Sequence, residues 1–442
     1  MESAGGDPRK DFFVETITKD VSLEDSILDL IDNCVDGARS HLIRQGKESL
    51  IEEDIEDRYE GYKIEIEIKD DRFIISDNCG GIPIDLAKEY AFYFGRRSED
   101  EPRKGESIGL YGIGMKRSFF KIGKRIKVES STSENAFDLN ISVDEWKGRE
   151  GWDFPLELIN TWDQPGTHIE LPYKENIDNR IKLNSFKKGL YKIIARDYSF
   201  IIREGLEIYL NEKKVNRYNF ELKKSDEFAP ARKTVEHEDV QIELIAGMAE
   251  LPPGDPAAEA VEAEARKEKE YYGWFIICND RVVLAADKSA TTVWGHDDFP
   301  SFHTQYYGFM GLAFFQGEPS DLPWTTSKRS VDESEGVYSF ARKYMKNITR
   351  PWIEYTSDRK KNYEEAEQKE SATTSVSVEN VEKNKEIKTP KFEDSTKSMA
   401  NINYKKPKEK VKEVSRILSG SDNMSYRDVG KKTFEYYVEM EL

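Results

Sequence analysis

The chain has 442 residues, of which 37% are hydrophobic and 34% charged, so it can bury a sizeable core in two or three domains. A formal net charge of -18 argues against nucleic acid or an anionic membrane as a default partner, because both repel an acidic surface. The three cysteines have no metal-binding spacing, and no apolar run is long enough to cross a bilayer, so we expect a cytoplasmic protein with reduced thiols.

The first third of the chain predicts a helix followed by paired strands. Apolar residues recur at helical spacing over residues 22–45, with Ser22 as the N-cap. Strict alternation predicts a half-buried strand over 62–69, and a second strand over 72–77 ends just before Gly80 and Gly81.

Further strands and helices are predicted after residue 120. A polar, aromatic-poor segment follows residue 358 and is typical of a flexible or solvated helical tail, with a short helical element at its end. The predicted strands lie near 124–130, 136–143, 166–172, 206–216, 240–247, 272–278 and 281–285, and the predicted helices near 183–204, 250–273 and 334–353.

The segment DLIDNCVDGA (29–38) places polar side chains on one helical face. Asp29 and Asn33 are four residues apart, and Asp36 lies close to the same face. A carboxylate and an amide oxygen suit a hard cation such as Mg²⁺, or a positioned water. A solvated acidic face on an ordinary helix explains this segment equally well when it is taken alone.

Two glycine-containing segments follow. In SDNCGGIP (76–83), Asp77 ends a strand beside glycines and could accept a hydrogen bond from a base amino group, although a simple turn also explains it. In IGLYGIGMKRS (108–118), three glycines precede a helix whose first turn carries Lys116. Backbone N–H groups of such a loop can hold an anion. The segment lacks the ending of a Walker A motif and the leading strand of a dinucleotide-binding fingerprint.

The order and spacing of these segments resemble the N, G1 and G2 boxes of the GHKL ATPases, the superfamily of gyrase B, the ninety-kilodalton heat-shock chaperone, sensor histidine kinases and MutL. GTHIEL (166–171) is similar to the final Gly-Thr strand of that superfamily, and the likeness is closest to MORC-type and MutL-type members. The resemblance covers roughly residues 20–175. It implies an α+β fold, a two-layer α/β sandwich of the Bergerat type, with ATP and Mg²⁺ as ligands.

The resemblance also implies roles for single residues. Asp29 matches the general base, which is Glu in most members, and Asn33 matches the magnesium ligand. Asp77 matches the adenine contact, and Thr167 matches the Thr that helps to hold adenine. Cys79 stands where the first G1 glycine is usual, and residues 90–108, with Arg96, Arg97 and Lys104, match the ATP lid. The predicted nucleotide-binding residues are Asn33, Asp36, Asp77, Gly81, Ile82, Gly109, Leu110, Tyr111, Gly112, Ile113, Gly114, Met115, Lys116 and Thr167.

A second resemblance lies downstream. GWFIICNDRVVLAAD (273–287) and LPWTTSKRSVD (322–332) look like the transducer domain of the MutL and MORC branch. That likeness makes Lys328 the candidate for a lysine that reaches the γ-phosphate, and a surface Lys-Arg pair is the alternative. We therefore predict an ATP-binding domain over 1–180, a smaller transducer-like α/β domain over 181–357 and a charged tail over 358–442.

The expected function is an ATP-driven conformational switch that binds ATP and ADP and forms an ATP-dependent homodimer. Two alternatives stay open: a nucleotide-gated scaffold with little hydrolysis, and a MutL-like or MORC-like DNA clamp, for which the net charge gives no support. A chaperone role rests on analogy alone. The five histidines are scattered and none precedes residue 29, so a phosphoacceptor histidine is not expected.

Overall fold

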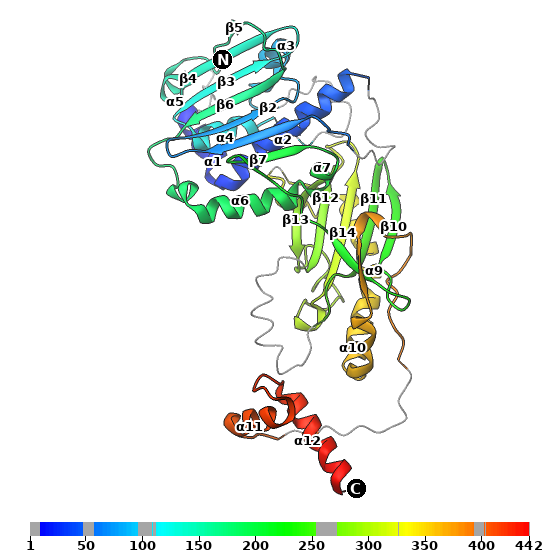
Figure 1. The fold of residues 1–442 in the computed structure, drawn as a ribbon. Helices are drawn as coiled ribbons and strands as arrows, with labels where there is room; N and C mark the ends of the chain where they lie inside the picture. The colour runs from blue at the N-terminus through cyan, green and yellow to red at the C-terminus, as the bar shows by residue number, and fades with distance from the viewer. Residues whose placement is uncertain are drawn as a thin grey trace, which may run out of the picture.

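The molecule is built around two β-sheets, one above the other in Figure 1, with a helical hairpin near the C-terminal end. The structure is a computed structural model that describes residues 9–46, 57–95, 108, 112–252, 272–325, 327–392, 402 and 404–441.

The first sheet has eight strands in the order β5-β4-β3-β6-β2-β1-β7-β8. In β1 the isoleucines at 64, 66 and 68 are buried and the charged residues between them are not, so one face of the sheet is apolar. The strands are β1 (Lys63–Ile68), β2 (Arg72–Asp77), β3 (Arg125–Ser131), β4 (Ala136–Ser142), β5 (Glu157–Ile159), β6 (Gly166–Pro172), β7 (Glu207–Leu210) and β8 (Lys213–Lys214).

Helices cover the apolar face of this sheet, which gives the predicted two-layer α+β arrangement (Figure 1). The longest is α2 (Leu23–Arg44), which begins where the Ser22 side chain accepts a hydrogen bond of 3.0 Å from the Asp25 N–H. Its buried apolar side chains pack into the core. The other helices of this layer are α1 (Lys10–Lys19), α3 (Ile84–Leu86), the π-helical turn η1 (Ala87–Ala91), α4 (Gly114–Ile122) and α5 (Val143–Gly148).

The first sheet continues past residue 180. After the 3₁₀ turn η2 (Asn179–Lys182), α6 (Asn184–Asp197) and α7 (Ser199–Arg203) bring the chain back to the sheet. Strand β7 then pairs in parallel with β1, with Ile208 opposite Ile64. The boundary at residue 180 remains a prediction, but the sheet itself ends only at Lys214.

The second sheet has the order β10-β11-β14-β12-β13, and its central strands β14 and β12 are buried on both faces. Helix α9 (Gly336–Arg359) packs on one face, and a separate apolar cluster from α7, β9 and the 3₁₀ turn η4 (Val378–Asn380) covers the other. Strand β12 is therefore buried at every position, as a doubly covered strand should be. The strands are β9 (Glu221–Lys224), which lies outside the sheet, β10 (Ala231–His237), β11 (Val240–Met248), β12 (Gly273–Cys278), β13 (Arg281–Asp287) and β14 (Phe309–Gln316), with the turn η3 (Thr304–Tyr306) before β14.

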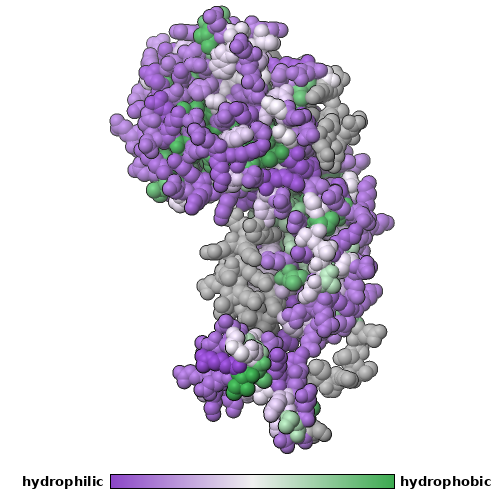
Figure 2. Space-filling view, in the orientation of Figure 1, coloured by the Kyte–Doolittle hydropathy of each residue, from purple (hydrophilic) through white to green (hydrophobic). Residues whose placement is uncertain are grey.

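Part of the predicted tail packs on this second unit. After α10 (Tyr363–Ser371), strand β15 (Thr374–Ser377) pairs with β9, and single bridges join Asn384 to Arg232 and Lys388 to Ala229. Helices α11 (Lys408–Ser419) and α12 (Tyr426–Glu441) form a hairpin. This hairpin shows a hydrophobic patch in Figure 2.

The predicted elements from 22 to 216 and the strands near 240, 273 and 281 all correspond to elements of the structure. The predicted helix over 250–273 falls largely outside the described residues. None of the described helices is long and apolar enough to span a membrane.

Candidate functional site

A cavity of about 560 Å³ opens between α2, the N-terminus of α4 and the segment that follows β2. Its walls come from segments that are far apart in the sequence. They are formed by Ile17, Asp29, Asn33, Asp36, Gly37, Ser40, Ile43, Arg44, Gly81, Ile82, Pro83, Leu86, Tyr90, Ala91, Gly112, Ile113, Gly114, Met115, Lys116, Arg117 and Lys328.

One face of α2 forms the polar wall. The Asn33 side-chain amide donates to the Asp29 carbonyl at 2.8 Å, which leaves its Oδ1 as the atom that can meet a cation. Asp36 is buried, and its Oδ1 accepts a 2.7 Å hydrogen bond from the Ile108 N–H. An amide oxygen beside a nucleotide's phosphates is a suitable donor set for Mg²⁺, which binds few protein ligands directly. The side chain of Asn33 therefore fits the predicted magnesium role.

Asp29 is the most enclosed acid of the cavity wall after Asp36, with 5% of its surface exposed. Its Oδ2 accepts hydrogen bonds from Arg117 at 3.1 Å (Nε) and 2.5 Å (Nη2). Burial raises the pKa of the Asp29 carboxyl, while the positive charges of Lys328 and Arg117 act in the opposite direction. A buried acid with a raised pKa can take up a proton more readily than an ordinary aspartate.

The second half of the glycine-rich segment packs against α2. A Cβ on Gly114 would lie 3.2 Å from Cγ of Asp29, so the absence of a side chain allows this close approach. Lys116 is buried and donates from Nζ to the Ala91 carbonyl at 2.8 Å, which ties α4 to η1. Gly109, Leu110 and Tyr111, and the lid residues Arg96, Arg97 and Lys104, lie outside the described residues.

The segment that follows β2, with Gly81 and Ile82, packs against strand β3 of the first sheet. Gly81 has φ +67°, and a Cβ there would lie 2.0 Å from the Ser131 carbonyl oxygen. The Ile82 N–H donates to Ser130 Oγ at 2.8 Å, and that hydroxyl lies 3.0 Å from Thr167 Oγ1. This chain of contacts connects the cavity wall to β3 and β6.

Two predicted adenine contacts do not line the cavity. Asp77 accepts a 2.8 Å hydrogen bond from the Cys79 N–H, and burial raises the pKa of its carboxyl to about 6. Thr167 is buried opposite Asp77 in the β2–β6 pair. Asp77 precedes the Gly81 segment in the chain, and Thr167 contacts Ser130, which accepts a hydrogen bond from the wall residue Ile82.

Lys328 enters the cavity from a loop almost three hundred residues beyond α2. Its backbone has φ +53°, and its Nζ donates to Asp32 Oδ2 at 3.0 Å. The other oxygen of Asp32 accepts hydrogen bonds from Tyr198 at 2.6 Å and from Arg281 Nε at 3.1 Å. Arg281 of β13 in the second sheet and the Lys328 loop therefore both contact α2 through Asp32.

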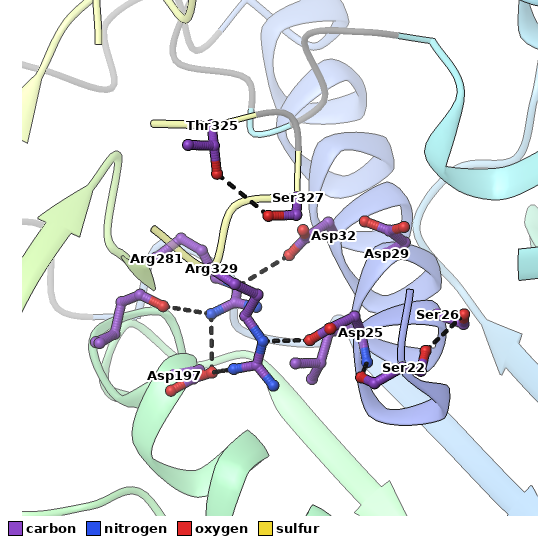
Figure 3. A network of polar contacts seen from close by, with 12 residues as sticks. Ser22, Asp25, Ser26, Asp29, Asp32, Asp197, Arg281, Thr325, Ser327 and Arg329 are labelled. Carbon is purple, nitrogen blue, oxygen red and sulfur yellow. Dashed lines mark hydrogen bonds and ion pairs between the residues drawn. The ribbon is translucent and has the colours of Figure 1, made fainter. Parts of the chain in front are cut away.

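The same loop is anchored by a second cation. Arg329 forms ion pairs with Asp25 of α2 and, at 3.0 Å, with Asp197 at the end of α6. Arg281 pairs with Asp197 at 3.1 Å, so both arginines lie between α2 and α6 (Figure 3). The ion pairs of Lys328 and Arg329 thus fix the position of this loop relative to the cavity.

Several wall residues were not predicted. Helical spacing from Asn33 continues to Gly37, Ser40 and Arg44, so the same periodicity that paired Asp29 with Asn33 would have found them. Arg117 follows Lys116 directly, and nothing in the sequence distinguishes which of the two cations meets Asp29.

Residues 21–165 match the family model described as histidine kinase-, DNA gyrase B- and HSP90-like ATPase. The match covers less than half of the chain and contains the N, G1 and G2 segments, so the predicted superfamily is confirmed. No curated protein matches the chain. The closer likeness to MORC and MutL stays a prediction, as do the roles of the individual site residues.

Proposed function

We propose, from the premise that residues 21–165 form a domain of this ATPase superfamily, that the protein binds ATP with Mg²⁺ and hydrolyses it to ADP and phosphate. The proposal is carried by one observation: Asp29, Asn33 and Lys328 line the same cavity, although Lys328 belongs to the loop that follows strand β14 of the second sheet. A cavity with hard oxygen donors and several cations suits a magnesium-bound polyphosphate.

Each of these residues has a role in the proposed reaction. Asn33 would hold Mg²⁺, which neutralises phosphate charge when it is bound. Asp29 would accept the proton of the attacking water, as a raised pKa favours. Lys328 would move from Asp32 to the terminal phosphate, which is lost on hydrolysis.

The position of Lys328 makes the site a conformational switch. Its loop is anchored between α2 and α6 by Arg329, and Arg281 joins Asp32 to Asp197. Transfer of the lysine to a phosphate would leave Asp32 with Arg281 and Tyr198, and would draw the second sheet toward the nucleotide. We propose that this movement accompanies lid closure and homodimer formation in the cytoplasm, and that hydrolysis reverses it.

A nucleotide-gated scaffold is the second candidate. It is favoured by the two hydrogen bonds from Arg117 to Asp29, because a carboxylate held in this way is a poorer base. The ATPase and the scaffold both predict that the protein binds ATP. They differ in whether the bound ATP is turned over.

The decisive experiment measures phosphate release and ATP affinity of the full chain with Mg²⁺. We expect Asp29→Asn to lower turnover by about 10² or more, the usual contribution of a general base, and Asn33→Ala to abolish magnesium-dependent binding. Lys328→Ala should lower turnover more than ADP affinity, whereas Lys192→Ala, at an exposed position of α6, serves as the control.

The outcomes separate the candidates. Binding without turnover in the wild type would favour the scaffold. Turnover that Lys328→Ala leaves unchanged would exclude the transducer role of this lysine, and a wild type that neither binds nor hydrolyses ATP would reject the ATPase assignment.

A further inference from the structure

Arg117 occupies one carboxylate oxygen of the proposed base. Its guanidinium donates from both Nε and Nη2 to the same atom, Asp29 Oδ2, and the side chains of Arg117 and Asp29 are only 10% and 5% exposed. These are charge-assisted hydrogen bonds in a buried setting, where such bonds are strong. In this state a water could reach that oxygen only by displacing the arginine.

The cations of the cavity wall do not all have comparable partners. Lys116 Nζ donates to the neutral carbonyl of Ala91, and Lys328 contacts Asp32, which also accepts hydrogen bonds from Tyr198 and Arg281. Within the part of the chain that the structure describes, Arg117 is the wall cation that hydrogen-bonds to the carboxylate of the proposed base. The planar guanidinium of Arg117 can also bind phosphate oxygens, which resemble a carboxylate in charge and geometry.

We propose that the Arg117–Asp29 ion pair masks the base at rest, and that a phosphate group of the bound nucleotide takes the guanidinium and releases Asp29. The inference rests on the proposed function and adds to it a residue that positions the base and binds phosphate. No covalent bond changes in the exchange. Arg117 exchanges the Asp29 carboxylate for a phosphate as its hydrogen-bond partner. The carboxylate is then free to accept the proton of a water. Hydrolysis would therefore depend on correct phosphate placement.

The exchange predicts opposite effects of two substitutions on ATP affinity. Asp29→Asn removes the anion that competes with phosphate for Arg117, so the Kd for ATP should fall by about tenfold, even though turnover is lost. Arg117→Met should raise that Kd by about tenfold or more, and Arg117→Lys by less, because a lysine keeps the charge but not the planar guanidinium. Titration calorimetry of the full chain with Mg²⁺ and ATP measures all three variants.

A double variant distinguishes masking from a purely structural role. If Asp29→Asn tightens ATP binding by freeing Arg117, that gain should disappear when Arg117→Met is combined with it, so the double variant should have the Kd of Arg117→Met alone. Arg125→Met, at an exposed position of β3, should leave the Kd of the wild type unchanged.

Two results would overturn the inference. One is that the wild type, Asp29→Asn and Arg117→Lys all bind ATP with the same affinity. Both variants keep groups that can form hydrogen bonds in the buried site. The other is a gain in affinity from Asp29→Asn that persists when Arg117 is also replaced. Both results leave the ATPase assignment intact, whereas a wild type without any affinity for ATP defeats the assignment and the inference together.

Discussion

Glu204 is a buried carboxyl at the junction of the two sheets. It ends α7, lies 3.4 Å from Arg58 and shares its surroundings with Asp280 in the turn between β12 and β13. Asp280 in turn pairs with Arg39 of α2 at 3.4 Å. Burial, followed by repulsion from Asp280, raises the pKa of Glu204 to about 8 from its ordinary value of 4.5.

This raised pKa predicts a loss of stability with rising pH. Between about pH 4.5 and 8 the folded protein keeps a proton on Glu204 that the unfolded chain releases, so the free energy of unfolding falls across that window. Glu204→Gln carries no such proton. Urea unfolding measures the free energy of unfolding of both proteins at pH 5 and pH 8. The variant should be more stable relative to the wild type at pH 8 than at pH 5. The same difference in stability at both pH values would contradict this expectation.

The sequence predicts local relations in the site better than distant ones. Asp29 and Asn33 are one helical turn apart, so their common face follows from periodicity alone. The ion pair of Asp29 with Arg117 spans 88 residues, and that of Asp32 with Lys328 spans 296. No local pattern encodes such pairs, because they depend on how α4 and the Lys328 loop pack against α2.

At the scale of elements, the turn after β2 depends on Gly81. An alanine there would have φ +67° and a Cβ 2.0 Å from the backbone oxygen of Ser131, a contact that requires β3 or the turn to move. We expect Gly81→Ala to lower the free energy of unfolding by on the order of 3 kcal/mol and to weaken ATP binding.

Gly189 is the matched control for that substitution. It lies within α6, where an added Cβ meets nothing within 4 Å. Gly189→Ala should raise the free energy of unfolding by about 0.5–1 kcal/mol, since alanine is the better helix former. Denaturant unfolding of both variants checks the pair, and equal effects would show that the close approach at Gly81 is not limiting.

The first elements that were predicted have a clear period, and several that were missed do not. The alternation of β1 and the spacing of α2 each follow from one buried face. Strand β14, FMGLAFFQ, is buried on both faces and has no alternation, while β9 and β15 are short and mostly polar. These last two strands form only because residues 153 or so apart in the chain are brought together.

At the scale of the whole molecule, the α11–α12 hairpin is weakly attached. Among the described residues, its contacts with α10 include the Lys431–Glu364 ion pair and Arg427, which lies 4.2 Å from the centre of the Tyr363 ring. Exposed pairs of this kind contribute about 0–1 kcal/mol each. A chain that ends at residue 392 should therefore keep the ATP affinity of the full chain and unfold within a few degrees of it in a thermal melt. A large drop in either quantity would indicate that the hairpin supports the nucleotide site.

The parallel pairing of β7 with β1 has a consequence for synthesis on the ribosome. Strand β1 is finished by residue 68, yet its partner is complete only at residue 210, so the nascent chain carries an open sheet edge while the intervening 140 or so residues are made. Until then β1 presents unpaired backbone groups to any other chain nearby. A recombinant fragment cut at residue 165 or 180 would keep that edge permanently, and we expect it to aggregate where a fragment ending at residue 216 stays monodisperse.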